Sequence, residues 1–202
     1  MKKIIIISLI FVTLIVANIF ILNYSRQNKQ INNNVSPSST SQTPLTPQVE
    51  EKIITNFTEC LEAGFPIMES YPRQCKTTDN KNFIEDIGNE LNQRDQIILE
   101  NIRPNQIVTS PLTITGQARG TWFFEASFPI VLTDWDGIII ASGIATAKSD
   151  WMTEEFVAFE ATLTFDTPTY KNNGHLILKK DNPSGLPEYD ATLEIPVLFD
   201  MK

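Results

Sequence analysis

The sequence predicts an all-β fold in its C-terminal half, an antiparallel β-sandwich, and two observations support this prediction. Residues 116–165 alternate strand-like apolar runs with turn signals. Within this stretch, residues 159–165 (FEATLTF) place apolar side chains at odd positions and polar ones at even positions, which is the period of a half-buried strand. One face of each strand is therefore expected to pack and the other to face water.

The number of strands narrows the fold. We expect strands at 106–110, 112–117, 127–133, 138–147, 157–165, 175–180 and 192–199. Seven short strands in about 100 residues are typical of an immunoglobulin-like sandwich. The same spacing also fits a jelly roll or a barrel, so it leaves the topology open.

Two local signals shape this sandwich. The segment Asp134-Trp135-Asp136-Gly137 lies between two expected strands and predicts a hairpin turn, in which Gly137 is free to take a positive φ. Pro196 interrupts the last strand. Because proline lacks an amide donor, this residue predicts that the last strand lies toward a sheet edge.

The N-terminus predicts membrane targeting. Ile4 to Leu22 is a run of 19 residues without charge that follows Lys2 and Lys3, and it is long enough to cross a hydrocarbon core of about 30 Å. We expect residues 1–23 to be a transmembrane helix or a signal peptide. The lack of an Ala-x-Ala cleavage site favours an uncleaved single-pass anchor in the cell membrane, whereas cleavage would produce a secreted protein.

Residues 24–50 are rich in Ser, Thr, Asn and Pro, and they predict a disordered stalk. The next part, residues 51–90, contains Cys60 and Cys75, the two cysteines of the chain. In a chain with an export signal, such a pair predicts one disulfide and an extracytoplasmic location; two unrelated thiols are the alternative. Residues 103–202 are expected to form the sandwich.

A short helix and a hairpin turn are expected within residues 51–90, the disulfide-closed segment. Thr58 is expected to cap a short helix that stops at Gly64, and Asp79-Asn80 is expected to turn a small hairpin. Residues 71–74 (YPRQ) lie inside the loop that the cysteines close. One alternative function is therefore a displayed loop of the protease-inhibitor kind.

The charge of the chain bears on its partners. The 24 acidic and 16 basic residues give a net charge of −8. Binding to the nucleic-acid backbone needs clustered Lys and Arg in excess, so we expect no nucleic-acid partner. We also expect no cofactor and no metal.

Catalytic constellations are weak in this sequence. His175 is the single histidine, and no serine lies in a nucleophile-elbow context, so a Ser-His-Asp site is not expected. Loop carboxylates could perform glycosidic acid–base chemistry or hold calcium, although ordinary turn roles are favoured. These carboxylates are Asp134, Asp136, Asp150, Glu154 and Glu155.

The candidate binding surface consists of Trp135, Arg119, Trp122, Trp151 and Glu154. Trp135 is expected to be exposed in its turn and able to stack on a sugar or a peptide side chain. Trp122 and Trp151 are more typical of a core. Arg119 and Glu154 are expected to join a cation–π or ion-pair cluster that locks two loops.

Several motifs follow one another in order: Ser110-Pro111-Leu112 with Gly116-x-Ala118-Arg119-Gly120, then residues 122–129 (WFFEASFP), 151–154 (WMTE) and 180–185 (KDNPSG). From about Arg103 to Phe199 they resemble the immunoglobulin-like domain of bacterial spore germination proteins. The resemblance implies an extracytoplasmic β-sandwich with a binding or structural role. The second, germination-related domain that often accompanies it is absent from this sequence, which leaves a general role in the envelope.

These observations predict a non-enzymatic binding or scaffolding protein of the bacterial cell envelope. Its expected partners are the membrane, through the anchor, and peptidoglycan or an envelope protein. A peptidoglycan-directed hydrolase that uses loop carboxylates is an alternative, as is the protease-inhibitor-like loop.

Overall fold

The computed structural model describes residues 53–201. The predicted anchor and stalk, residues 1–23 and 24–50, lie outside the described residues. Among residues 53–201, no helix combines the length and the apolar character that crossing a membrane requires.

Two β-sheets organise the described chain. A small sheet has the order β1-β2-β3, and a sheet of eight strands has the order β4-β6-β9-β8-β7-β10-β11-β5. The elements are α2 (Phe57–Glu62), β1 (Ile67–Met68), β2 (Gln74–Lys76), β3 (Asn82–Ile84), α3 (Glu90–Gln93), β4 (Ile97–Leu99), β5 (Ile107–Val108), β6 (Leu112–Arg119), η1 (Gly120–Trp122), β7 (Ser127–Asp134), β8 (Ile139–Ala147), β9 (Phe156–Leu163), β10 (Asn173–Lys179), η2 (Pro187–Tyr189) and β11 (Thr192–Phe199).

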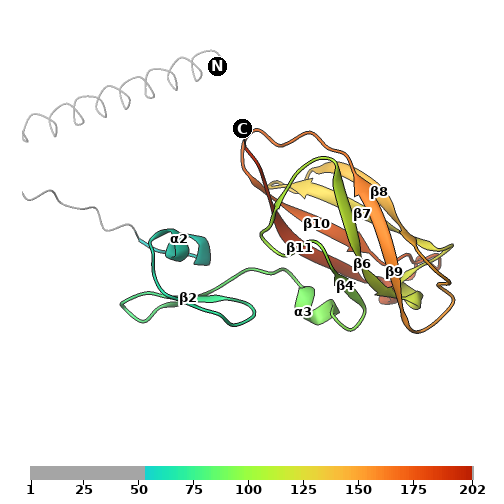
Figure 1. The fold of residues 1–202 in the computed structure, drawn as a ribbon, viewed down its shortest axis with the longest axis horizontal. Helices are drawn as coiled ribbons and strands as arrows, with labels where there is room; N and C mark the ends of the chain where they lie inside the picture. Colours follow the sequence, from blue (N-terminus) through green and yellow to red (C-terminus); the bar gives the residue numbers. More distant parts are fainter. Residues whose placement is uncertain (1–52, 202) are drawn as a thin grey trace, which may run out of the picture. The chain divides into compact units, whose positions relative to one another are not determined.

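The large sheet folds over itself into two layers. β8 and β9 pair only through Thr146 with Glu160 and Ala147 with Phe159. By contrast, β6 pairs with β9, and β7 with β8 and β10, over much of their length. One layer is therefore β4-β6-β9 and the other β8-β7-β10-β11-β5, and β6 and β9 pass in front of β10 and β11 in Figure 1. This is the predicted immunoglobulin-like sandwich, and the described strands do not close into a barrel.

The core lies between the two layers. Along β11 the buried residues are Leu193, Ile195, Val197 and Phe199, while the residues between them are partly exposed. The same alternation holds on β6 and β9. It confirms the predicted period, because successive side chains of a strand point to opposite faces.

Aromatic rings fill one part of this core. The Phe128 ring lies 5.1 Å from the Phe123 ring and 5.0 Å from the Phe159 ring, in both cases edge to face. The Trp122 ring lies 6.3 Å from Phe128 in the same arrangement. Edge-to-face packing is favourable because the ring edge and the ring face carry opposite partial charges.

The eight-stranded sheet begins earlier than the predicted start at residue 103. Ile97–Leu99 form β4, which pairs antiparallel with Gly116–Ala118 of β6. Ile97 is fully buried in the sandwich core. Three residues are too few for a clear alternation, so the sequence pattern did not assign this strand to the sandwich.

The edge of β11 that faces away from β10 is covered by the segment before the sandwich. The backbone N–H of Glu194 donates to Oδ1 of Asn89 over 2.8 Å, and the N–H of Asn89 donates to the Glu194 carbonyl over 3.0 Å. Further along, Asn105 N–H donates to the Pro196 carbonyl over 2.8 Å. β11 therefore lies next to the sheet edge, which refines the expectation from Pro196.

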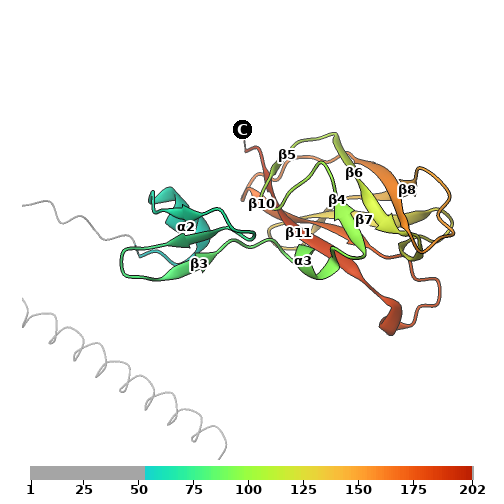
Figure 2. The ribbon, with the colours of Figure 1, turned by 60° about the horizontal axis from the view of Figure 1, so that its bottom comes forward.

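Figure 2 shows α3 beside β11, and Gly88 just before it makes this approach feasible. A Cβ atom on Gly88 would lie 1.9 Å from the Glu194 carbonyl oxygen, and its φ is +65°. Both features require glycine.

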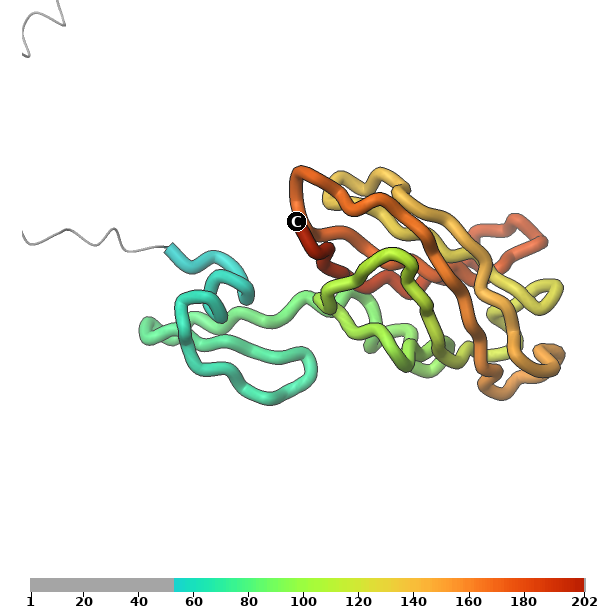
Figure 3. Tube along the Cα trace, turned by 45° about the horizontal axis from the view of Figure 1, so that its top comes forward, coloured from blue at the N-terminus to red at the C-terminus, as the bar shows by residue number. Residues whose placement is uncertain are grey.

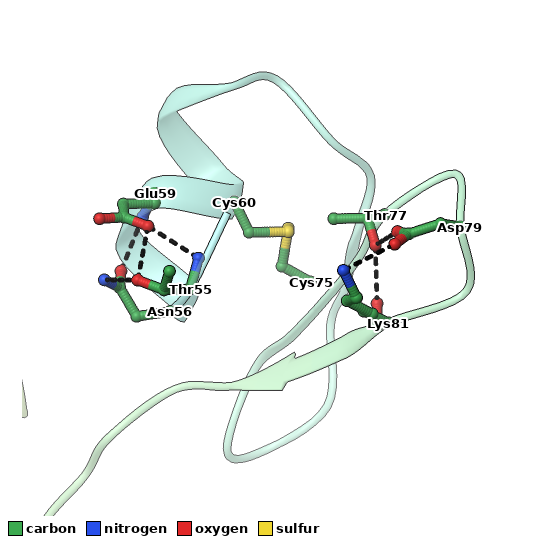
Figure 4. Close-up of a disulfide and its surroundings, with 8 residues drawn as sticks. All are labelled: Thr55, Asn56, Glu59, Cys60, Cys75, Thr77, Asp79 and Lys81. Carbon is green, nitrogen blue, oxygen red and sulfur yellow. Dashed lines mark hydrogen bonds and ion pairs between the residues drawn. A yellow bond between two sulfur atoms is a disulfide. The ribbon is translucent and has the colours of Figure 1, made fainter. Parts of the chain in front are cut away.

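The predicted disulfide is present. Cys60 and Cys75 are joined, fully buried, and packed with Phe57 in a small hydrophobic cluster. Figure 4 shows the bond between α2 and the strand that carries Cys75. The predicted turn at Asp79-Asn80 is also present, with Asn80 at φ 65° between β2 and β3.

The cap of α2 differs from the expectation. Asn56, not Thr58, is the N-cap, and its Oδ1 accepts the backbone N–H of Glu59 over 2.9 Å. Glu59 in turn accepts the N–H of Thr55 over 2.8 Å, as Figure 4 shows. This reciprocal arrangement resembles a capping box, except that Glu59 accepts the N–H of the residue before the N-cap and not that of the N-cap itself.

Candidate binding surface

Arg119 connects two loops at one end of the sandwich. Its guanidinium lies 4.1 Å from the centre of the Phe156 ring. Its Nε donates to the carbonyl of Asp95 over 3.1 Å, and Nη1 donates to the carbonyl of Glu154 over 3.3 Å. The predicted cation–π cluster is therefore present, but its ring is Phe156, and Glu154 contributes its backbone rather than its carboxylate.

The carboxylate near Arg119 belongs to Glu155, whose Oε2 lies 3.7 Å from Nη1. Glu155 is largely exposed, so this ion pair adds little to stability. The nearby Gly120 is packed against the backbone of Trp151 and Thr153, because a Cβ there would lie 2.3 and 1.9 Å from their carbonyl oxygens. The cluster holds the loop after β8 against the end of β6.

Trp122 is not part of a surface. Its side chain is 1% exposed and lies in the sandwich core. Its indole N–H has no hydrogen-bond partner among the described residues, and its carbonyl accepts the N–H of Asp181 over 3.0 Å. This corrects its place in the candidate surface and agrees with the expected core role. Trp151 is partly buried and packs against the same core.

The motifs at 116–129, 151–154 and 180–185 meet at this end. The loops 120–126, 148–155 and 180–191 gather at the end of the sandwich away from the C-terminus in Figure 3. Their contacts include the bond from Asp181 to Trp122 and a bond from Gly120 N–H to the Glu155 carbonyl of 3.0 Å. These motifs, which are separate in the sequence, thus form one structural unit, the loop end.

The loop end contains an unusual turn. Phe124 and Ser127 exchange two backbone hydrogen bonds of 3.0 Å, which close a two-residue hairpin loop. Its central residues, Glu125 and Ala126, have φ of 49° and 62°. Asn-Gly is the preferred pair for such a turn, and other residues pay a conformational cost of roughly 1 kcal/mol each. Phe124 beside the turn is exposed.

Trp135 lies at the opposite end of the sandwich, in the predicted hairpin. Oδ1 of Asp134 accepts the N–H groups of Asp136 and Ile138 over 3.0 and 2.9 Å, and Gly137 takes a φ of +77°. These contacts confirm the predicted turn. The Trp135 side chain is 37% exposed, so the turn presents it only in part.

Two residues missed by sequence reasoning complete the Trp135 site. The ring of Tyr170, 73% exposed, lies 5.4 Å from the Trp135 ring, and Nζ of Lys171 lies 3.9 Å from the centre of the Trp135 ring. Both come from the loop between β9 and β10. We call Trp135, Tyr170 and Lys171 the aromatic cluster. Their signal in the sequence was weak, because the loop 166–172 (DTPTYKN) has no periodicity.

The structure does not bring together the candidate carboxylates of the two different loops. Asp134 and Asp136 precede β8, whereas Asp150, Glu154 and Glu155 follow it. A strand of nine residues spans roughly 25 Å, far beyond the separation of about 5–10 Å that paired glycosidase carboxylates need. Oδ1 of Asp150 accepts the N–H of Met152 over 3.0 Å, which is an ordinary turn role.

A hollow of about 470 Å³ opens between β8 and β9, and it is lined by Ile144, Thr146, Ala147, Lys148, Glu160, Ala161 and Thr162. Glu160 is the acid among these residues, and its Oε2 pairs with Nζ of Lys148 over 3.4 Å. One paired carboxylate does not form an acid–base couple. Within residues 53–201, no three His, Cys, Asp or Glu side chains are grouped as a metal site would need.

The loop at Tyr71–Gln74 is held by contacts within the chain. Nε of Arg73 donates to Oε2 of Glu85 over 2.9 Å, and its Nη2 donates to Oε1 over 2.5 Å. The Tyr71 hydroxyl donates to Glu90. Burial, followed by this hydrogen bond, raises the pKa of Tyr71 above its ordinary range. These contacts hold the loop in place, while the Tyr71 side chain remains 52% exposed.

His175 lies on β10 opposite Thr133 of β7 and Pro196 of β11. It is partly exposed on the outer side of its sheet. The Thr133 hydroxyl donates to the His175 carbonyl over 3.5 Å. Neither Thr133 nor Pro196 carries an acid–base group, so His175 has the surroundings of an ordinary strand residue.

Comparison with protein families identifies one domain. No curated protein and no solved structure matched the chain. Residues 97–185 match the model of the immunoglobulin-like domain of bacterial spore germination. The match begins at β4, which agrees with the observed start of the sheet. The C-terminal sandwich thus carries the immunoglobulin-like domain of bacterial spore germination, as its sequence motifs predict.

Proposed function

We propose that this protein is a non-enzymatic binding module of the bacterial cell envelope, anchored in the membrane by residues 4–22 and carrying its sandwich outside the cytoplasm. The family match supports a bacterial context related to spore germination. The buried disulfide between Cys60 and Cys75 supports an oxidising compartment. The apolar N-terminal run supports the anchor.

The observation that carries the binding role is the aromatic cluster. Exposed aromatic rings provide a large contact area at a small cost in conformational entropy, and sugar rings stack on them. Tyr170 presents most of its side chain to solvent next to Trp135. Lys171 places a cation beside both rings, at 3.9 and 5.8 Å from their centres. A glycan that bears carboxylates, such as peptidoglycan, fits this combination.

A second candidate ligand is an envelope protein bound at the loop end. The observation that favours it is the turn at Glu125 and Ala126, since backbone strain of this kind concentrates at functional sites. Exposed apolar side chains, among them Phe124 and Met152, lie in the same loops.

A pull-down with residues 52–202, produced under oxidising conditions, tests these assignments. The protein is incubated with purified peptidoglycan and, separately, with detergent-solubilised envelope proteins. Retention on peptidoglycan that is lost in Tyr170→Ala and Trp135→Ala supports the glycan site. Tyr189→Ala is the matched control, because Tyr189 is an exposed tyrosine in the loop between β10 and β11, at the loop end.

The other outcomes are equally decisive. Release of soluble fragments from peptidoglycan contradicts the non-enzymatic role. Retention of a defined envelope protein that depends on Phe124 and not on Tyr170 transfers the binding role to the loop end. A lack of retention in both assays contradicts the proposal.

A further inference from the structure

The two outer faces of the sandwich differ in character. On the β4-β6-β9 layer the outward residues of the long strands are mostly polar, among them Thr113, Thr115, Gln117, Glu160 and Thr162. On the other layer the outward positions include six apolar residues: Pro129, Val131, Ile144, Ile177, Pro196 and Leu198. An antiparallel sheet with one solvated face normally shows polar residues there.

The register shows that these apolar residues form one band. Ile144 is opposite Pro129, Val131 is opposite Ile177, and Leu198 is opposite Ile107 of β5. The band therefore runs diagonally across all five strands, from Ile144 on β8 to Ile107 on β5. These two end residues are 58% and 59% exposed. We call this surface the apolar band.

The charges beside the band are balanced. Lys179 on β10 and Glu194 on β11 lie on one flank of it. Ile177 pairs with Glu194 and Lys179 pairs with Thr192, so Lys179 is one outward position beyond Ile177 of the band, and Glu194 is directly beside Ile177. The chain as a whole carries a net charge of −8, so two copies repel each other over most of their surface. Beside the band, one cation and one anion cancel, and His175 lies on the same face opposite Pro196.

We propose that the apolar band is an interface between two copies of this chain. Sheets pack face to face through apolar side chains, and a copy of the chain supplies the same band. A two-fold axis that crosses the band between Lys179 and Glu194 sets Lys179 of each copy against Glu194 of the other. The interface is then self-complementary in apolar character and charge.

The size of the outer face that the band crosses fits a weak dimer. This face has five strands at a spacing of about 4.8 Å and a length of seven residues at about 3.3 Å, and it covers roughly 550 Å² on each copy. The total of about 1,100 Å² lies at the lower end of specific interfaces. Dimerisation is therefore concentration-dependent, and two copies anchored in one membrane meet at a high local concentration.

Sedimentation equilibrium of residues 52–202 over a wide concentration range tests this interface. The described residues contain both hydrophobic clusters and the disulfide, so this part of the chain carries its own core. A dimer is expected, and Ile144→Lys and Ile107→Lys are each expected to raise its dissociation constant about tenfold or more. Both side chains are largely exposed, so these changes leave folding intact. Thr115→Lys on the polar outer face is the matched control and leaves the dimer unchanged.

Charge reversal provides an independent test. Lys179→Glu and Glu194→Lys each place like charges against each other and weaken the dimer, whereas the double variant restores the pairing and the affinity. A monomer at all concentrations overturns the proposal. A dimer that is insensitive to Ile144→Lys and Ile107→Lys, or a double variant no better than the single ones, also overturns it.

Discussion

Arg73 binds the carboxylate of Glu85 with two hydrogen bonds, of 2.9 and 2.5 Å. Glu85 is buried at the end of the small sheet, and Nδ2 of Asn105 also donates to its Oε1 over 3.3 Å. Asn105 belongs to the segment that covers β11 through Pro196. One carboxylate therefore links the disulfide-closed segment to the edge of the sandwich sheet.

Removal of Arg73 should destabilise the protein. In Arg73→Ala, the carboxylate of Glu85 stays buried without its cation, and such a loss costs about 3–5 kcal/mol when both partners are buried. Since the Arg73 side chain is partly exposed, we expect the free energy of unfolding to fall by about 2 kcal/mol, measured by urea denaturation. Lys81→Ala, which breaks the exposed pair with Asp79, is the control and should have little effect.

The same pair predicts a dependence on pH. The hydrogen bond from Arg73 holds the pKa of Glu85 below its ordinary value. A lowered pKa in the folded state stabilises the protein above the unfolded value of about 4.3, and this stabilisation is lost as the pH falls through the lowered value. Urea denaturation between pH 7 and pH 3 should show that loss. The decline should be smaller in Glu85→Gln, and an unchanged decline would count against Glu85 as its source.

The disulfide should account for much of the stability of the small sheet. It closes a loop with a sequence separation of 15 residues, for which the chain-entropy model gives about 3 kcal/mol. The double variant Cys60→Ser, Cys75→Ser should lose protection of the β2–β3 amides in hydrogen exchange. Protection of β10 and β11 should persist, because the sandwich core contains neither cysteine. Equal loss in both sheets would show that the two unfold together.

Gly88 should tolerate substitution less well than Gly137. Both residues have a positive φ, so alanine costs roughly 1 kcal/mol at each position. At Gly88 the new Cβ would also meet the Glu194 carbonyl oxygen at 1.9 Å, whereas nothing lies within 4 Å of the corresponding position at Gly137. Thermal unfolding should therefore show a larger loss for Gly88→Ala. Equal losses would mean that the segment moves away from β11 without cost.

The sequence predicted the sandwich better than its surroundings, for physical reasons. Long strands such as Phe156–Leu163 have enough residues to show their alternation. β4 has three residues, and its place is decided by pairing with β6. Asn89 and Asn105 cover β11 by backbone-like hydrogen bonds, which depend on contacts distant in the sequence and leave no periodic signal.

The candidate binding surface shows the same difference between features set by local sequence and features set by distant contacts. Trp135 was predicted from its own turn, since Asp and Gly specify local geometry. Tyr170 and Lys171 approach it from a loop more than thirty positions later, so only the fold reveals the cluster. Arg119 was expected in a cation–π contact, but the ring it contacts, Phe156, is set by its pairing position on β9.

The turn at Glu125 and Ala126 supports the last prediction. Replacing these two residues with Asn-Gly, the pair that suits two consecutive positive φ angles, should raise the free energy of unfolding by about 1–2 kcal/mol. The backbone hydrogen bonds between Phe124 and Ser127 are kept, so the core contacts of Phe123 and Phe128 should not change. Urea denaturation measures the gain, and Ser149→Gly, placed in a neighbouring loop, controls for a general effect of adding glycine.

If the stabilised variant binds an envelope protein less tightly than the natural chain, the side chains of Glu125 and Ala126 contribute to that contact, and the strain is retained for function. If stability does not rise, the turn is not strained, and the argument for a ligand at the loop end loses its basis. Binding to peptidoglycan should be the same in both proteins, because Trp135 of the aromatic cluster follows the far end of β7 from this turn.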